Sequence, residues 1–226
     1  MITPVEDKQL TPETNLGLSL FVGVVLSLGA LLLFYLLVTG VTTNAPIVQI
    51  DQNIALTLHS IVSPQLLNLM IAFSLLGLQV LWLVVIIIAL YYAVRRQWNH
   101  LTVWIAAVAG IEILTEILKL FIRRPRPVFT NPFVTALQFS FPSGHASVSL
   151  VVYGLIAYLM MSAVNVGWKR TLILTTMTVL ILMIGFSRIY LGVHFFSDVI
   201  AGYVIGVIWL AICINALGIL QRHHKR

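Results

Sequence analysis

Six long apolar segments constrain this chain more than any other feature of its sequence. A helix rises about 1.5 Å per residue, so about 20 apolar residues cross the hydrocarbon layer of a bilayer, which is roughly 30 Å thick. Only 9% of the residues are charged, against roughly 25% in soluble domains. The sequence therefore predicts an all-α fold, a polytopic membrane helical bundle with six transmembrane helices. The six segments are 17–39, 66–94, 100–121, 143–163, 169–188 and 194–219.

The six segments follow one another without a change in composition. No long linker, low-complexity tract or clear internal repeat separates them, which predicts a single domain over residues 1–226. The first apolar run is longer than the h-region of a signal peptide, about 7 to 15 residues, and acidic residues outnumber Lys8 before it. We therefore expect this run to be retained as a transmembrane helix. The single cysteine, Cys213, leaves no partner for a disulfide or a cysteine metal site.

Basic residues at the ends of the segments predict the orientation of the chain. The positive-inside rule places the loops after the second and fourth segments, and the C-terminal tail, in the cytoplasm. With six spans both termini are then cytoplasmic, and residues 40–65, 122–142 and 189–193 face the other side. Because most of the net charge of +6 lies at such helix ends and loops, no nucleic-acid partner is expected. The basic residues are Arg95, Arg96, Lys169, Arg170, Arg222, Lys225 and Arg226.

Two loops on the predicted outer side carry further signals. Arg123, Arg124 and Arg126 cluster in residues 122–142 against the positive-inside rule, which indicates cations held for ligand chemistry. Arg123 and Arg124 could instead meet lipid headgroups. Residues 40–65 contain no Lys or Arg and mix polar with apolar residues, which predicts a short interfacial helix or a lid.

Basic and histidine side chains recur at three fixed spacings near the ends of the third to sixth segments. Charged groups are costly in an apolar chain unless they bind something, and phosphate is the anion that cations and histidines suit. The predicted topology brings all three motifs to one membrane face. They read Lys119-x6-Arg126-Pro127, Pro142-Ser143-Gly144-His145 and Ser187-Arg188-x5-His194-x3-Asp198.

The second motif precedes a strong helical pattern. Ser143 can cap this helix, and the free N–H groups of its first turn can bind phosphate. Gly144 allows a close approach of the backbone to a ligand. The alternative is an ordinary helix start.

The first and third motifs supply a histidine, a carboxylate and three cations. On a helix, His194 and Asp198 would share one face, where the carboxylate holds the imidazole in one tautomer. This arrangement suits a histidine nucleophile activated by an orienting acid, although a histidine in a membrane can also pack or line a pore. Lys119, Arg126 and Arg188 would stabilise charge on a transferring phosphoryl group. The alternative for each cation is that it snorkels to the interface.

Two carboxylates lie within the third segment. Glu116 is three residues before Lys119 and four after Glu112, so all three share one helical stripe. We expect an ion pair between Glu116 and Lys119 and a structural role for both carboxylates. A proton pathway or a grip on Lys119 is the alternative.

Taken together, the three motifs resemble those of the type 2 phosphatidic acid phosphatase superfamily of membrane lipid phosphatases, which also includes soluble vanadium haloperoxidases. The motif-bearing core covers residues 100–219. The resemblance implies a membrane-embedded phosphoric ester hydrolase that acts without a metal or other cofactor. A haloperoxidase is disfavoured, because those relatives are soluble.

The resemblance also implies a role for each residue of the motifs. His194 is expected to attack phosphorus and to become a phosphohistidine, with Asp198 orienting it. His145 is expected to protonate the leaving oxygen as general acid. The residues expected to bind the phosphate oxygens are Lys119, Arg126, Ser143, Gly144 and Arg188.

The expected function is release of inorganic phosphate from a phosphorylated membrane lipid on the extracytoplasmic face of the cell membrane. Phosphatidic acid, phosphatidylglycerol phosphate and undecaprenyl diphosphate all remain open as substrates. The alternatives are a lipid phosphotransferase, and a transporter with a phosphate-binding vestibule, for which broken helices in matching halves would argue. The sequence leaves the oligomeric state open.

Overall fold

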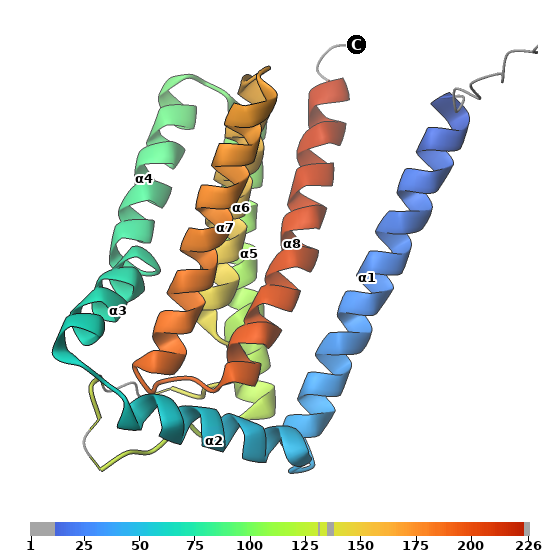
Figure 1. Ribbon diagram of the computed structural model, residues 1–226. Coiled ribbons are helices and arrows are strands. Elements are labelled where there is room, and N and C mark those ends of the chain that lie inside the picture. The colour runs from blue at the N-terminus through green and yellow to red at the C-terminus, as the bar shows by residue number, and fades with distance from the viewer. Residues whose placement is uncertain (1–11, 131, 135–137, 224–226) are drawn as a thin grey trace, which may run out of the picture.

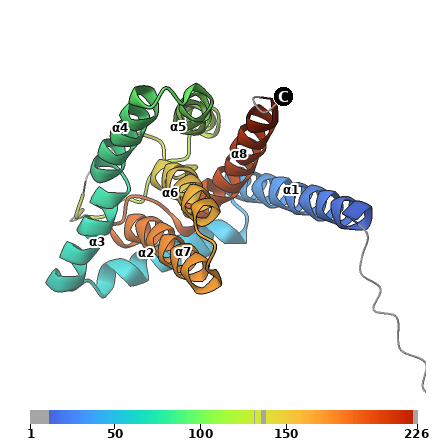
Figure 2. The same ribbon diagram turned by 90° about the horizontal axis from the view of Figure 1, so that it is seen from above.

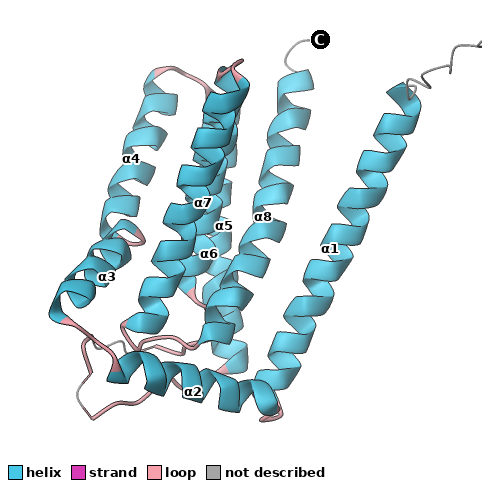
Figure 3. Cartoon of the chain, in the orientation of Figure 1, coloured by secondary structure: helices cyan, strands magenta, loops and turns pink. Residues whose placement is uncertain are grey.

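The computed structural model describes residues 12–130, 132–134 and 138–223. These residues form eight helices and no strand (Figures 1 and 3), so the predicted all-α fold is confirmed. The single-domain assignment stays a prediction. The helices are α1 (Pro12–Thr42), α2 (Pro46–Ser60), α3 (Pro64–Leu76), α4 (Gln79–Val94), α5 (Trp98–Ile122), α6 (Gly144–Ala163), α7 (Gly167–Tyr190) and α8 (Phe196–His223).

Helix α6 forms the centre of the bundle, where it packs against α5, α7 and α8. Helix α1 contacts α8 and α2 and projects away from the bundle (Figures 1 and 2). The core side chains Ile111, Val151 and Ile184 are fully buried between α5, α6 and α7. Outward-facing side chains are also apolar: Ile87 is 64% exposed and Phe121 is 82% exposed. An exterior this apolar matches a lipid solvent rather than water.

Four helical segments are long and apolar enough to cross a bilayer among the described residues. A fifth is counted if the pair α1–α2, bent by 81°, is taken as one span. Helix α5 runs alongside them in the bundle with its 25 residues (Figure 1). The chain is therefore a multi-pass membrane protein, while six spans and cytoplasmic termini stay predictions. The four segments are Pro64–Val94, Gly144–Ala163, Gly167–Tyr190 and Phe196–Gln221.

The predicted span 66–94 is not one continuous helix. It is broken between α3 and α4, where Leu78 leaves helical geometry with φ −138° and ψ −76°. A Cβ atom on Gly77 would lie 2.5 Å from Ile184 Cγ2 and 3.2 Å from His145 Cδ2, so only glycine fits against α6 and α7 here. The break therefore brings backbone close to a histidine of the second motif.

The predicted short helix within residues 40–65 is confirmed as α2, which lies across one end of the bundle (Figure 1). Pro46 occupies its first turn, where a missing N–H costs nothing. Asp51 and Ala55, one turn apart, are buried against the bundle, while Ile50 and Leu56 are exposed. Burial of an acidic side chain at this helix predicts a polar partner inside the protein.

The end of the bundle covered by α2 also contains residues 123–130 and 138–143 and the turn 191–195 (Figure 1). The start of α1 and the end of α8 lie at the opposite end. The three motifs therefore meet at one end of the bundle, as the predicted topology requires. Which side of the membrane this end faces stays a prediction.

Candidate active site

The first motif is positioned by an abrupt end to α5. Lys119 is in the last turn, and Arg123 closes the helix in the left-handed region with φ 51°, its N–H donating to the Lys119 carbonyl at 2.9 Å. The chain then turns back, and Ser140 N donates to the Arg124 carbonyl at 2.9 Å. Because the loop folds back in this way, Arg126 lies at the end of the bundle, where it donates to the carbonyls of Gln138 and Val193.

The second motif starts α6, but not as the sequence suggested. Ser143 is the residue before the helix, yet its side chain makes no capping hydrogen bond, and its Oγ is buried without a partner among the described residues. Its backbone N–H instead donates to the Asp198 carbonyl at 2.9 Å. The predicted cap is therefore wrong, because the backbone of α8 fixes this residue. Gly144 and His145 still present first-turn N–H groups that lack helical partners.

The third motif spans the turn between α7 and α8. Gly192 takes φ +72°, and the N–H groups of Val193 and His194 both donate to the Arg188 carbonyl at 3.2 Å. His194 therefore precedes α8, whereas Asp198 lies in its first turn, so the predicted shared helical face is wrong. The turn still brings the side chains together, with His194 Nδ1 3.5 Å from Asp198 Oδ2.

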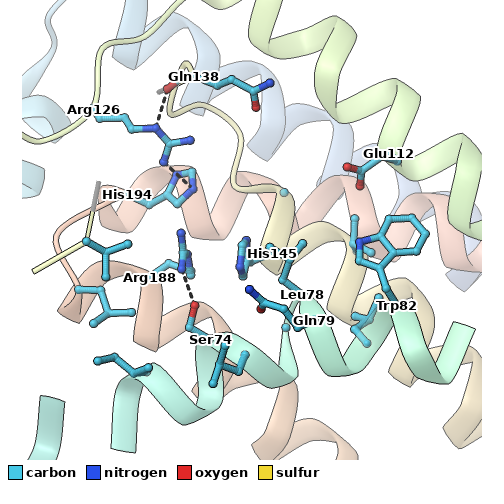
Figure 4. Close-up of a pocket in the computed structure, with 18 of the residues that line it drawn as sticks. Ser74, Leu78, Gln79, Trp82, Glu112, Arg126, Gln138, His145, Arg188 and His194 are labelled. Carbon is cyan, nitrogen blue, oxygen red and sulfur yellow. Dashed lines mark hydrogen bonds between the residues drawn. The ribbon is translucent and has the colours of Figure 1, made fainter. Parts of the chain in front are cut away.

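The contacts of His194 define the state of its imidazole ring. Arg126 Nη1 donates to His194 Nε2 at 3.1 Å (Figure 4). It also donates to the Val193 carbonyl at 2.7 Å. Because guanidinium has only donors, Nε2 must accept, which leaves the proton on Nδ1, facing Asp198. Burial lowers the pKa of His194 to about 4, against the opposing pull of Asp198. The ring is therefore neutral at pH 7, with a lone pair on Nε2.

Arg188 approaches the same place from the end of α7. In Figure 4, His194 lies between Arg126 and Arg188, and Arg188 Nη1 donates to Ser74 Oγ at 2.5 Å. The Arg188 Nε atom is buried without a partner in the described part of the chain. A buried guanidinium donor with no acceptor is suited to an anionic ligand.

These side chains surround a pocket of about 650 Å³. A cavity of this size suits a small ligand or headgroup, because ligand pockets range over roughly 300–1,000 Å³. Ser143 and Asp198 do not line it and lie buried behind its wall. The break between α3 and α4 also contributes, through Ser74, Leu78 and Gln79. The predicted site residues that line the pocket are Lys119, Arg126, Gly144, His145, Arg188 and His194.

The two carboxylates of α5 also line the pocket. The predicted ion pair is confirmed, since Lys119 Nζ lies 2.7 Å from Glu116 Oε1. Figure 4 shows Glu112 and Trp82 at the far end of the pocket from His194. The structural role expected for both carboxylates stays a prediction.

Replacing Glu116 with glutamine is expected to leave turnover within about threefold of the wild type, because a helical pair that is partly exposed contributes only about 0.5 kcal/mol. The Glu116 side chain is 38% exposed, so solvent screens its charge. Turnover and thermal unfolding should be measured together, with Glu112→Gln as the companion. A large loss of turnover in well-folded Glu116→Gln protein would give this carboxylate a chemical role.

The structure decides between the two interpretations of Arg123 and Arg124 and adds Asp51, which was not singled out from the sequence. Arg124 was left open between ligand chemistry and lipid headgroups, yet it is buried and donates to Asp51 Oδ2 and Asp198 Oδ1. Arg123, by contrast, is exposed and donates to the Leu120 carbonyl. The one signal available in the sequence was Asp51 itself, the single acidic residue of 40–65, whose burial only the structure reveals.

Comparison with known proteins shows which family carries these motifs. Residues 100–221 match the model of the PAP2 superfamily. Phosphatidylglycerophosphatase B of Bacillus subtilis (strain 168) is 34% identical over 181 residues, which cover 78% of this chain and 87% of that protein. An undecaprenyl-diphosphatase of Sulfolobus acidocaldarius is 29% identical over 162 residues, covering 69% and 73%.

A solved structure extends the similarity to three dimensions. The crystal structure of a transmembrane PAP2 type phosphatidylglycerolphosphate phosphatase from Bacillus subtilis superposes with a TM-score of 0.76 at 29% identity. The match covers 84% of this chain and 94% of that one. The motifs, the fold and the relatives agree, and the chain belongs to the PAP2 superfamily as a membrane-embedded phosphoric ester hydrolase.

Proposed function

We propose that this protein releases inorganic phosphate from a phosphorylated membrane lipid through a phosphohistidine on His194. The observation that carries this proposal is the position of His194, whose Nε2 lies 3.1 Å from Arg126 Nη1 at a pocket that Arg126, Arg188 and Lys119 also line. A nucleophile among fixed cations is what phosphoryl transfer requires, because positioning and electrostatics supply most of its catalysis.

The reaction proceeds in two displacements. His194 Nε2 attacks phosphorus, the N–P bond forms and the bond to the lipid oxygen breaks, while His145, which is protonated once the anionic substrate has bound beside it, gives its proton to that oxygen. Water then attacks phosphorus and gives a proton to His145, the N–P bond breaks, and inorganic phosphate leaves. During both steps Arg126, Arg188 and Lys119 neutralise the phosphoryl oxygens. The ligand takes Arg126 away from Nε2, which frees the lone pair for attack.

The first-choice substrate is phosphatidylglycerol phosphate, which the named activity of the Bacillus relative favours. Phosphatidic acid and undecaprenyl diphosphate are the other candidates, the latter because the Sulfolobus relative is an undecaprenyl-diphosphatase. The three motifs lie at the end of the bundle that the basic loops predict to be extracytoplasmic, so we place the reaction on that face of the cell membrane.

The deciding experiment measures inorganic phosphate release by purified protein in detergent, with each of the three lipids, with and without a metal chelator. Release that survives the chelator supports a histidine mechanism, and the rates rank the substrates. Product analysis with an added lipid acceptor separates hydrolysis from phosphotransfer. Absence of release from all three lipids would defeat the proposal.

Replacing His145 with alanine is expected to slow cleavage of an alkyl phosphate by roughly 10²–10⁴-fold, the usual contribution of a general acid. An aryl phosphate should lose much less, because its leaving oxygen is stable without a proton. The measurement compares turnover of phosphatidylglycerol phosphate with that of p-nitrophenyl phosphate.

Val148→Ala is the matched control, because Val148 lines the same pocket and its side chain has no ionisable proton to donate. It should affect the two substrates alike. If His145→Ala also slows both substrates equally, the acid role is wrong.

A further inference from the structure

A buried cluster of three charged side chains, Asp51, Arg124 and Asp198, connects α2 to the start of α8, shortly after His194. Arg124 lies between Asp51 and Asp198, donating from Nη2 to Asp51 Oδ2 at 2.8 Å and from Nη1 to Asp198 Oδ1 at 2.6 Å. The Arg124 side chain is 6% exposed, and both carboxylates are fully buried. None of the three lines the pocket, so the cluster cannot touch a substrate held there.

Neighbouring groups complete the cluster. Ser197 N donates to Asp51 Oδ1 at 2.9 Å, and the Ser197 hydroxyl accepts from Arg124 Nη1 at 2.8 Å and donates to Asp51 Oδ2. The Arg124 guanidinium carbon lies 4.2 Å from the centre of the Phe195 ring. Since Phe195 and Ser197 flank the start of α8 next to His194, Arg124 contacts the chain at the end of the turn 191–195 and directly after it.

We propose that Arg124 and Asp51 are positioning residues for the reaction, which hold the Asp198 carboxylate so that its Oδ2 faces His194. This inference rests on the proposed function. Arg124 occupies Oδ1, and the N–H of Phe195 donates to Oδ2 at 2.9 Å, so the carboxylate cannot rotate. Oδ2 is then left at 3.5 Å from His194 Nδ1.

Asp51 has an electrostatic role in addition to its hydrogen bonds. Arg124 alone would neutralise Asp198 and weaken its attraction for the positive charge that develops on the ring as the N–P bond forms. Asp51 offsets Arg124, so the three side chains retain one net negative charge behind His194. Arg126 and Arg188 face the ring from the pocket side and disfavour a positive charge on it. The net negative charge of the cluster offsets this effect as His194 becomes positive. The titratable and charged groups that face His194 are Asp198, Arg126, Arg188 and His145.

The chain offers a matched set of variants. Arg124→Gln removes the charge, Arg124→Lys keeps the charge but loses the fork that spans two carboxylates, and Asp51→Asn removes the opposite charge. Arg123→Gln is the control, because Arg123 is the preceding residue, is exposed and lies outside the cluster. All four are compared with the wild type for phosphate release and for thermal unfolding.

Arg124→Gln is expected to lower kcat about 100-fold with little change in KM, the cost of a misplaced catalytic group that leaves binding intact. Arg124→Lys should recover part of this loss, and Arg123→Gln should lose nothing. Wild-type kcat in Arg124→Gln overturns the proposal. An equal loss of kcat in Arg123→Gln also overturns the proposal, because the loss would then come from the net charge of the loop and not from the contacts of Arg124.

A second readout does not depend on turnover. Histidine-selective ¹⁵N labelling follows the titration of His194, whose signal is the one missing from His194→Ala. Arg124→Gln should move the His194 titration to higher pH and Asp51→Asn to lower pH, because they remove opposite charges. The proposal is overturned if the two variants move the His194 titration in the same direction. It is also overturned if Asp51→Asn leaves the titration unchanged, and this second test holds even where Arg124→Gln fails to fold. Failure of the proposed function appears separately, as a wild type that releases no phosphate.

Discussion

Replacing His194 with alanine is expected to reduce phosphate release by roughly 10⁶-fold, the scale on which a hydrolase loses turnover with its nucleophile. Apart from His145, the charged side chains described at the pocket are unsuited to the role. Arg126, Arg188 and Lys119 are cations, Glu116 is engaged by Lys119, and Glu112 lies at the far end of the pocket.

His145 is the second imidazole of the pocket and the natural competitor for the nucleophile. Within the described part of the chain no carboxylate forms an ion pair with its ring, whereas Asp198 Oδ2 lies 3.5 Å from His194 Nδ1. An imidazole that gains positive charge on attack needs such a partner, because charge developing in a low-dielectric site is otherwise unfavourable. A single-turnover experiment with ³²P-labelled lipid, quenched in base to preserve phosphohistidine, should therefore give labelled wild type and labelled His145→Ala, but unlabelled His194→Ala.

His59→Ala is the control for loss of a histidine at this end of the bundle. His59 is on α2, stacks on Phe129 with ring centres 4.1 Å apart, and does not line the pocket. It should retain turnover and labelling. If His194→Ala keeps wild-type release, the nucleophile is another group and the mechanism fails.

The positions of the helices could largely be predicted from the sequence, because a bilayer imposes a length of about 20 apolar residues on any span. The same constraint brought distant motifs together: once the segments cross, the ends of α5 and α7 and the start of α6 must lie at one end. The turn before α8 follows for the same reason. Lys119, Arg126, His145, Arg188 and His194 meet at one pocket as this topology requires.

The break in the second predicted span could not be seen in the same way. Ser74, Gly77 and Gln79 interrupt the apolar run here, but the mean hydropathy of the segment stays high and does not distinguish a continuous helix from two helices joined by one irregular residue. The break is imposed by close packing against Ile184 and His145, from helices far along the chain. Tertiary packing of this kind overrides local propensity.

The buried cluster of Asp51, Arg124 and Asp198 was not predicted from the sequence, for a related reason. Asp51 meets Arg124 across 73 positions and Ser197 across 146, and no spacing within one helix encodes such contacts. A local rule also gave a wrong answer at Ser143, where the capping pattern was present but the backbone of α8 had already fixed the residue. Motif spacing identifies residues that surround a ligand, whereas the residues that hold them are determined by packing.

Replacing Asp198 with asparagine is expected to lower turnover about 10⁴-fold, as the loss of an orienting carboxylate does in serine proteases. The reason lies in the partners of the carboxylate. Arg124 donates to Oδ1, so the asparagine oxygen must take that place and its NH₂ group must occupy the position of Oδ2. There it meets two other donors, the N–H of Phe195 and the Nδ1–H of His194.

The His194 ring can relieve this conflict only by moving its proton to Nε2, the atom that has to attack phosphorus. That tautomer conflicts in turn with Arg126 Nη1, which donates to Nε2 in the wild type. ¹⁵N shifts of His194 at neutral pH should therefore report Nδ1–H in the wild type and loss of that single tautomer in Asp198→Asn. Asp198→Ala separates the causes, because it removes the acceptor without introducing a donor, and it should retain the Nδ1–H form that Arg126 favours. Turnover of Asp198→Asn within tenfold of the wild type would mean that Arg126 alone fixes the reactive tautomer, and the carboxylate would then be needed for the position of the ring and not for its proton.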